Sequence, residues 1–383
     1  MTQNSSGAAR RVLFVANGNG EDSIAAEIIR KLPKSINAEA YPMVGNGRAY
    51  DELCPIVGPR AQIPSEGWRH TAGSVSRDLK GGMLSGILPS VKFLKSVRRR
   101  YDKIVGVGDG VGPLLCWLAG LQIDIYLDVF KSGFAHRYSF FERIVIGRAA
   151  KTVFCRDIML AGALCQAGID GRSAGNVMLD CVPYGTYDMA PHRTRTLAVT
   201  LLPGSRQTTA DSLAMQIGAL TLLSDEWAPD IFVAVATGID PKDLAKATGL
   251  TYRAGTGQQH ADLGMLEGQG LQLHLAHGVL GNLIEGSDLI LSQAGTATQQ
   301  ALGLGKPVIT FNRADNRAKR MRDEQSLMGE ARILTQQSQV DLAAAMQGLL
   351  ADSETRARLG KIGRERLGGP GTIEAVLALL HPG

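Results

Sequence analysis

The 383-residue chain has no long hydrophobic run. No segment reaches the roughly 18 uncharged apolar residues that a membrane-spanning helix requires. Residues 1–10 are short, polar and rich in small side chains, without the apolar core that an export signal carries. We therefore expect a cytoplasmic protein that does not cross a membrane.

Cysteines are few, and the seven histidines are scattered. The five cysteines lie far apart and form no CxxC pair, which favours buried, reduced thiols. His274 and His277 are three residues apart but have no acidic or cysteine neighbours, so we expect no protein-bound metal. The cysteines are Cys54, Cys116, Cys155, Cys165 and Cys181.

Aromatic residues make up only 5% of the chain, which argues against a base-stacking nucleic-acid platform. The net charge of +5 is unevenly spread. Residues 1–195 carry 25 Lys or Arg against 17 Asp or Glu, whereas residues 196–383 carry 16 against 19. A basic first half indicates an anionic partner, and we expect a membrane surface rather than a nucleic acid.

The chain is about twice as long as a usual single domain, so we expect two domains with separate cores. Apolar, β-branched runs followed by turns and helical patterns recur in both halves. The predicted strands are residues 11–16, 103–107, 124–127, 152–155, 197–202, 231–236, 288–292 and 306–311. This alternation predicts an α/β fold of two Rossmann-like domains with parallel sheets, facing each other across a cleft.

A polar stretch with prolines, residues 183–196, has the composition of an interdomain linker. We place an N-terminal domain at residues 1–190 and a C-terminal domain at residues 197–370. The last helical segment, within residues 371–383, follows a Gly-Gly-Pro-Gly breaker that can let it cross back to the N-terminal domain.

The clearest candidate site is the turn Leu202-Pro203-Gly204-Ser205-Arg206, which follows a predicted strand and precedes a helix. Such a turn directs backbone N–H groups and a guanidinium toward one place, which suits a diphosphate. The alternative is an ordinary βα turn with a surface arginine.

A second turn of this kind spans residues 292–301. Its backbone donors and hydroxyl groups can hold the other side of the same diphosphate, and its glutamine can bond a ribose hydroxyl. The alternative is a hydroxyl-rich helix cap. Two such turns in one domain indicate one nucleotide at the carboxyl edge of the sheet. The candidate residues are Gly295, Thr296, Ala297, Thr298 and Gln300.

Together these motifs resemble the donor-binding half of GT-B glycosyltransferases, particularly the lipid-A-disaccharide synthase family. The resemblance extends to residues 301–309 (ALGLGKPVI) and to residues 175–180, which echo the family's Gly-x-Pro-x-x-Asp segment. It implies inverting transfer from a UDP-sugar, which is the donor substrate. We expect no cofactor. Uracil is implied near residues 276–283, and the diphosphate at Ser205, Arg206, Thr296 and Thr298.

The chain also departs from that family. Gln300 stands where the family usually has an acidic residue, and Thr208 and Thr209 stand where another acidic residue follows the arginine. The family's Pro-Asp-Phe and tryptophan-containing acceptor segments are replaced by residues 108–110 and 128–133. These differences indicate a related branch with different lipid substrates.

An inverting transfer needs a base for the acceptor hydroxyl, and a carboxylate is typical. Asp109 is our candidate because it follows a first-half strand between two glycines, and the resemblance places the family's catalytic aspartate there. The alternative is a turn aspartate that bonds its own backbone. Glu21, Asp22 and Asp128 are reserve candidates.

The loop Asn17-Gly18-Asn19-Gly20 follows the first predicted strand and is expected to border the acceptor pocket. Its glycines are also typical of an ordinary turn.

Residues 81–100 combine an apolar loop with a basic helix that we expect to begin at Pro89. This pattern predicts a membrane-docking surface, although Val91, Leu94 and Val97 fit better on a helix face packed against the sheet. A second basic run, residues 313–322, can meet phosphate or be a solvated helix.

We therefore expect an inverting glycosyltransferase that moves a GlcNAc-type sugar or a hexose from UDP to a lipid acceptor, on the inner face of the cytoplasmic membrane. A UDP-sugar 2-epimerase is the first alternative, since it uses the same fold. A non-catalytic nucleotide-sugar or lipid-binding protein is the second. The sequence leaves open which sugar and lipid are used, and whether the protein is a homodimer.

Overall fold

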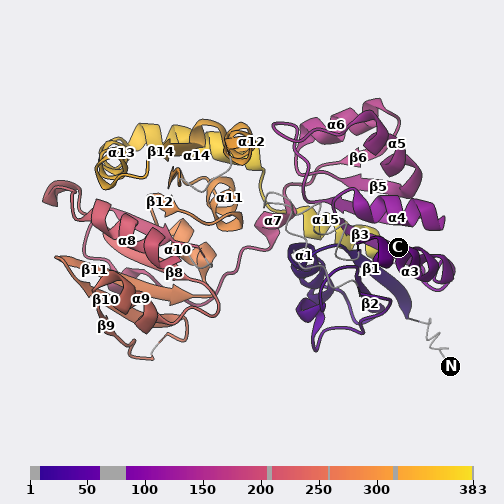
Figure 1. The fold of residues 1–383 in the computed structure, drawn as a ribbon, viewed down its shortest axis with the longest axis horizontal. Coiled ribbons are helices and arrows are strands. Elements are labelled where there is room, and N and C mark those ends of the chain that lie inside the picture. Colours follow the sequence, from indigo (N-terminus) through magenta and orange to yellow (C-terminus); the bar gives the residue numbers. More distant parts are fainter. Residues whose placement is uncertain (1–8, 61–82, 205–208, 258, 314–317, 382–383) are drawn as a thin grey trace, which may run out of the picture. The chain divides into compact units, whose positions relative to one another are not determined.

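The computed structural model describes residues 9–60, 83–204, 209–257, 259–313 and 318–381. The chain divides into two compact units, each with its own sheet (Figure 1). Unit 1 comprises residues 1–181 with 370–383, and unit 2 comprises residues 182–369. Both are α/β units with Rossmann-like sheets.

Unit 1 contains a six-stranded sheet in the order β2-β1-β3-β4-β5-β6, with every neighbouring pair parallel. The strands are β1 (Arg10–Ala16), β2 (Ile36–Pro42), β3 (Lys103–Gly108), β4 (Ile123–Asp128), β5 (Ala150–Phe154) and β6 (Asp170–Arg172). The helices are α1 (Asn19–Arg30), η1 (Arg48–Tyr50), α3 (Met83–Ser96), α4 (Val111–Ala119), α5 (Phe140–Ala149), α6 (Ile158–Gln166), α7 (Val177–Asp180) and α15 (Thr372–Leu380). Residues Val12 to Ala16 are all buried, as expected for a central parallel strand covered on both faces.

Unit 2 contains an eight-stranded sheet in the order β14-β13-β12-β7-β8-β11-β10-β9. Strand β10 is antiparallel to β9 and β11, and the other neighbours are parallel. The strands are β7 (Ala198–Leu202), β8 (Asp230–Val235), β9 (Thr251–Arg253), β10 (Asp262–Gly268), β11 (Leu271–His277), β12 (Leu289–Ser292), β13 (Val308–Phe311) and β14 (Arg332–Thr335).

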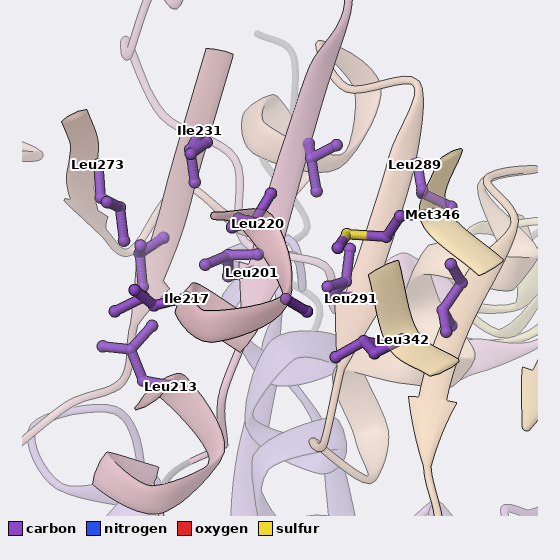
Figure 2. Close-up of a cluster of buried hydrophobic side chains, with 14 of the residues drawn as sticks. Leu201, Leu213, Ile217, Leu220, Ile231, Leu273, Leu289, Leu291, Leu342 and Met346 are labelled. Atoms are coloured by element: carbon purple, nitrogen blue, oxygen red, sulfur yellow. The ribbon is translucent and has the colours of Figure 1, made fainter. Parts of the chain in front are cut away.

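The helices of unit 2 cover this sheet. They are η2 (Ala190–His192), α8 (Thr209–Leu220), η3 (Asp225–Trp227), α9 (Pro241–Thr248), α10 (Leu280–Glu285), α11 (Thr296–Gly303), α12 (Ala318–Met328), η4 (Gly329–Ala331), α13 (Gln339–Ala351) and α14 (Ser353–Leu367). Helices α8 and α13 supply Leu213, Ile217 and Met346 to a core against the strands (Figure 2).

The C-terminal helix α15 returns to unit 1 (Figure 1). Ile373, Val376 and Leu380 are buried in the same core as strand β1. Asp180 receives hydrogen bonds from the backbone N–H groups of Gly371, Thr372 and Ile373, at 2.7, 2.9 and 3.2 Å. Asp180, the last residue of the segment that echoes the family motif, therefore caps α15.

The predicted linker packs on unit 2. Asn282 of α10 bonds the backbone of Gly185 and Tyr187, and Arg193 donates to the carbonyl of Gly286. Tyr187 is buried together with Phe232 of β8. The segment is thus held by side chains of the second unit.

Helix α3 corrects one prediction and confirms another. The helix begins at Met83 and continues through Pro89, although a proline inside a helix removes one backbone donor. Leu94 and Val97 are buried in the core of unit 1, so the interpretation of a helix packed on the sheet is confirmed. Residues 81 and 82, and the side chains of Met83 and Leu84, lie outside the described residues.

All five cysteines are free. The expectation that they are buried is right for Cys116 and Cys155 but wrong for Cys165, whose side chain is exposed on α6. His274 and His277 lie on strand β11, where residues three apart point to opposite faces. No helix in the described part of the chain combines the length and hydropathy needed to cross a bilayer.

Candidate functional site

In unit 2 the two predicted phosphate turns begin side by side. Strand β7 is the first strand of its sheet and lies between β8 and β12, so the chain changes its winding direction there. Leu202 at the end of β7 pairs with Ser292 at the end of β12, and the N–H of Gln293 donates to the carbonyl of Leu202 at 2.8 Å. Loops after strands at such a switch point leave a ligand-binding crevice in open α/β sheets.

The first turn is described as far as Gly204. The nearest atom to a Cβ added there is the carbonyl oxygen of Gln293, at 3.7 Å, so the two turns remain neighbours beyond the strand ends. Ser205 and Arg206, on which the guanidinium prediction depends, lie outside the described residues.

The second turn is closed by its own hydroxyl groups. Thr298 donates from Oγ1 to the carbonyl of Ala294 at 2.5 Å, and its oxygen lies 2.6 Å from the Ser292 hydroxyl. The N–H of Ala294 donates to Ser292 Oγ at 3.2 Å. Because the Thr298 proton is used by Ala294, the Ser292 hydroxyl must donate to Thr298, which leaves a closed relay of three bonds.

This relay gives Thr298 a structural role in the turn. Its side chain is buried and its hydroxyl bonds the backbone of its own turn. The predicted contact of Thr298 with a diphosphate stays a prediction. The relay is not a helix cap, because Thr298 donates to a carbonyl and α11 has no side-chain cap hydrogen bond. A Ser and a Thr six residues apart across a glycine turn are the signal that could have indicated it.

The start of helix α11 provides open backbone donors. Gly295 is its N-cap and makes no side-chain cap hydrogen bond, and the first turn contains no acidic residue. Gly295 and Thr296 are exposed, and Ala297 is half-buried. An uncapped N-terminus combines unsatisfied N–H groups with the positive end of the helix dipole, which favours an anion.

Gln300 lies on the buried face of α11 and is 5% exposed. Its contact with a ribose hydroxyl stays a prediction. The segment predicted to hold uracil, residues 276–283, runs from the end of β11 into helix α10, and β11 is parallel to β8. The segment therefore leaves the same edge of the sheet as the two turns.

In unit 1 the corresponding switch point lies between β1 and β3, because β1 is flanked by β2 and β3. Asn17 follows β1 and Asp109 follows β3. Asn17 Nδ2 donates to Asp109 Oδ1 at 2.5 Å, and the N–H of Asp109 donates to Asn17 Oδ1 at 3.3 Å. This pair of bonds joins two of the residues that the sequence singled out separately.

Glycine is required directly before Asp109. Gly108 has a φ of 154°, a conformation that other residues rarely adopt, and an added Cβ would collide with Asn17 Oδ1. Tyr126 also donates to the Gly108 carbonyl at 3.0 Å. The end of β3 is therefore held rigidly against the loop that follows β1.

Asp109 also fits the alternative interpretation, a turn aspartate that bonds its own backbone. Its Oδ1 accepts the backbone N–H of Val111 at 2.9 Å, which is the local bond of a turn aspartate. The carboxyl group is half-buried and is fixed by both Asn17 and Val111. A catalytic carboxylate benefits from such fixed orientation.

The other residues of the loop after β1 and of the first turn of α1 have separate surroundings. The carboxylate of Glu21 lies against Gly18, the N-cap of α1. Gly20 is exposed, with open space around its Cα. The side chain of Asn19 lies outside the described residues. The expectation that this loop borders an acceptor pocket stays a prediction.

Two reserve candidates for the base are buried. Asp22 is 2% exposed and accepts a hydrogen bond from the Tyr50 hydroxyl at 2.9 Å, and its burial raises its pKa to about 7. Asp128 accepts from the N–H groups of Phe130 and Lys131, and burial raises its pKa as well. Both side chains are buried in unit 1, whereas Asp109 is half-buried.

Several solved structures match nearly the whole chain. A putative UDP-N-acetylglucosamine 2-epimerase from Listeria monocytogenes aligns with a TM-score of 0.58 and 13% identity over 97% of this chain and 96% of that one. MurG from Acinetobacter baumannii aligns with a TM-score of 0.57 and 16% identity over 97% and 98%. The glycosyltransferase SnogD from Streptomyces nogalater aligns with a TM-score of 0.54 and 17% identity over 97% and 99%.

The chain has the GT-B fold. No family model and no curated protein matches the chain. At identities of 13% to 17%, these structural alignments show a shared fold and nothing finer. Within this GT-B chain each domain has its own switch point, with the paired turns in unit 2 and the Asn17–Asp109 pair in unit 1.

Proposed function

We propose that the protein is an inverting glycosyltransferase that takes a UDP-sugar as donor and a lipid as acceptor. The observation that carries the proposal is the convergence of the two glycine turns on adjacent strand ends, β7 and β12. Phosphate groups bind where N–H groups and helix N-termini converge at a switch point. The structural likeness to MurG and SnogD is consistent with this use of the fold.

In the proposed complex, the backbone N–H groups of Thr296 and Ala297 hold the diphosphate, and Ser205 and Arg206 approach it from the other turn. Thr298 and Ser292 keep the second turn in shape. The positive end of α11 and the Arg206 guanidinium offset the charge of the departing UDP. A protein-bound metal is not part of the proposal.

Asp109 is the proposed base. The acceptor hydroxyl attacks the anomeric carbon of the donor as Asp109 takes its proton, and the bond to UDP breaks with its electron pair on the phosphate oxygen. Asn17 and the N–H of Val111 orient the carboxylate for this step. Base catalysis of this kind contributes about 10²- to 10⁴-fold.

The finer assignment follows the resemblance to lipid-A-disaccharide synthases. We propose a GlcNAc-type sugar or a hexose as the transferred group, a glycolipid precursor as the acceptor, and peripheral attachment to the inner face of the cytoplasmic membrane. Gln300 and the altered acceptor segments support a branch with its own lipid substrate.

The test is transfer of labelled sugar from UDP-GlcNAc and UDP-glucose to a membrane lipid extract, with mass spectrometry of the product lipid. Asp109→Asn should reduce transfer by about 10²- to 10⁴-fold. Asp102→Asn, at the other end of strand β3, is the matched control and should retain transfer. Equal activity of Asp109→Asn and wild type would remove Asp109 from the mechanism.

A UDP-sugar 2-epimerase is the second candidate, and the match to a structure with that name over 97% of the chain favours it. An epimerase changes UDP-GlcNAc without any acceptor, whereas a transferase consumes it only with lipid. Proton NMR of UDP-GlcNAc incubated with the protein alone separates the two. UDP binding without turnover under either condition would support a non-catalytic binding protein.

A further inference from the structure

Large apolar side chains are exposed at the amino ends of helices α5 and α6. Phe140 and Phe141 are the first residues of α5, and Ile158 and Met159 are the first of α6. Phe140 is 73% exposed and Ile158 is 80% exposed. Phe130, in the loop after β4, is also exposed. We call these five residues the apolar tip.

The loop after β4 links the members of the apolar tip. The N–H of Gly133 donates to Asp157 Oδ2 at 2.8 Å, and a Cβ on Gly133 would lie 2.6 Å from the Cβ of Met159. Lys131 pairs with Glu142 of α5 at 2.7 Å. The loop is thus tied to the first turns of both helices, and the five side chains belong to one surface.

Helix formation does not explain these residues. Ser139 caps α5 with a full capping box, and Asp157 caps α6 by accepting the N–H of Leu160. Polar or acidic residues would suit the following first-turn positions better, since they complement the helix dipole. Clustered exposed apolar side chains at such positions mark an interaction surface.

The apolar tip lies at the same edge of the sheet as Asp109. Strands β3, β4 and β5 are parallel neighbours, so the loops that follow them leave from their shared carboxyl edge. Asp109 follows β3, the Phe130 loop follows β4, and α6 follows β5. The tip and the proposed base therefore belong to the same edge of the sheet of unit 1.

The surrounding charge favours an anionic occupant. Residues 129–143 contain three Lys or Arg and a single Glu, and that Glu is paired with Lys131. A second copy docking tip to tip would bring like charges together, because a two-fold interface presents the same patch on both sides. Apolar insertion flanked by basic residues is typical of binding to an anionic bilayer.

We propose that the apolar tip docks unit 1 on an anionic lipid bilayer. The link to an acceptor rests on the proposed function, because a transferase acting on a lipid needs its base near the membrane. Docking itself requires only the tip and its basic neighbours. The membrane surface predicted within residues 81–100 stays a separate prediction.

The experiment is sedimentation of the full-length protein with vesicles of phosphatidylcholine containing about 30% phosphatidylglycerol, and with phosphatidylcholine alone. The test variant is Phe140→Glu combined with Ile158→Glu. Acidic residues in a first helical turn favour the helix, so this variant should fold. Val340→Glu is the matched control, since Val340 is an exposed apolar residue in the first turn of α13 in unit 2.

Wild type and Val340→Glu should bind the anionic vesicles, and the double variant should lose at least about tenfold in partitioning. Retained binding of the double variant, absent binding of wild type, or equal binding to neutral vesicles would each overturn the proposal. The proposal would also be overturned if wild type bound no vesicles and sedimentation equilibrium showed a wild-type dimer that the double variant does not form. Titration of the same proteins with UDP tests the proposed function separately from docking. If the proteins bind vesicles but wild type does not bind UDP, the docking proposal stands and the proposed function fails.

Discussion

Asp22 is buried with only part of its carboxyl group satisfied. Tyr50 bonds Oδ1, whereas Oδ2 is buried and has no hydrogen-bond partner. Burial is the largest cause of the rise in its pKa from 3.8 to about 7, and the nearby charge of Glu21 adds to it. The folded protein therefore binds a proton at Asp22 more tightly than the unfolded chain does.

This difference predicts a pH dependence of stability. A raised folded-state pKa stabilises the fold fully below the unfolded pKa, and the contribution is lost as pH rises through about 7. At about 1.4 kcal/mol per pKa unit, the loss amounts to at most about 4 kcal/mol between pH 4 and 8.

Asp22→Asn cannot ionise, so its stability relative to wild type should increase from pH 5 to pH 8 in urea unfolding. Asp51→Asn, an exposed neighbour, should show no such increase, and an identical pH profile for Asp22→Asn and wild type would contradict the account.

Thr296 and Thr298 are two residues apart and have different expected roles. Thr298→Val removes the hydroxyl that joins Ser292 to Ala294 and should cost about 1–3 kcal/mol of unfolding free energy. Thr296→Val changes an exposed side chain and should leave stability within about 0.5 kcal/mol. Thermal unfolding measures both. Equal stability losses in the two variants would show that the relay does not hold the turn.

Among the elements, α15 depends on a cap that is distant in sequence. Asp180 accepts three N–H groups at the start of this helix, and Asp180→Ala should cost about 0.5–2 kcal/mol in urea unfolding. Glu374→Ala, an exposed change in the same helix, is the control and should cost less than about 0.5 kcal/mol. An unchanged Asp180→Ala variant would mean that the core contacts of Ile373 and Val376 alone hold α15.

The sequence predicts elements well where apolar runs are continuous. Strands β1, β3, β7 and β12 are within two residues of their predicted bounds, because buried parallel strands consist of uninterrupted β-branched and leucine residues. Strand β2 has a polar, alternating sequence at the sheet edge and was not predicted. Strands β10 and β11 form a hairpin whose short turn at residues 269–270 gave no recognised signal.

Some features of the candidate site can likewise be predicted from the sequence, and others cannot. The positions of both turns follow from glycines after apolar runs, but the adjacency of β7 and β12 does not, because strand order depends on how the intervening chain crosses the sheet. Likewise, the pairing of Asn17 with Asp109 joins loops 92 residues apart. Whether a turn hydroxyl faces inward, as in Thr298, depends on its hydrogen-bond partners and not on its spacing.

At the scale of the whole molecule, the proposed donor binding belongs to unit 2, and the proposed acceptor chemistry and membrane contact belong to unit 1. Each unit has its own sheet and core, so substitutions in one should leave the other folded. UDP is therefore expected to bind wild type and Asp109→Asn equally, because Asp109 belongs to unit 1.

The most direct measurement is calorimetric titration of the full-length protein with UDP, comparing wild type with Gly295→Asp. Gly295 has a backbone conformation in the helical region, which any residue adopts, and room for a side chain, and an acidic residue at a helix N-terminus complements the helix dipole. The variant should fold at least as stably as wild type, yet its carboxylate occupies and repels the proposed phosphate position. The account predicts UDP binding by wild type and a loss of at least about tenfold in the variant. Absent binding by wild type, or unchanged affinity in Gly295→Asp, would contradict it.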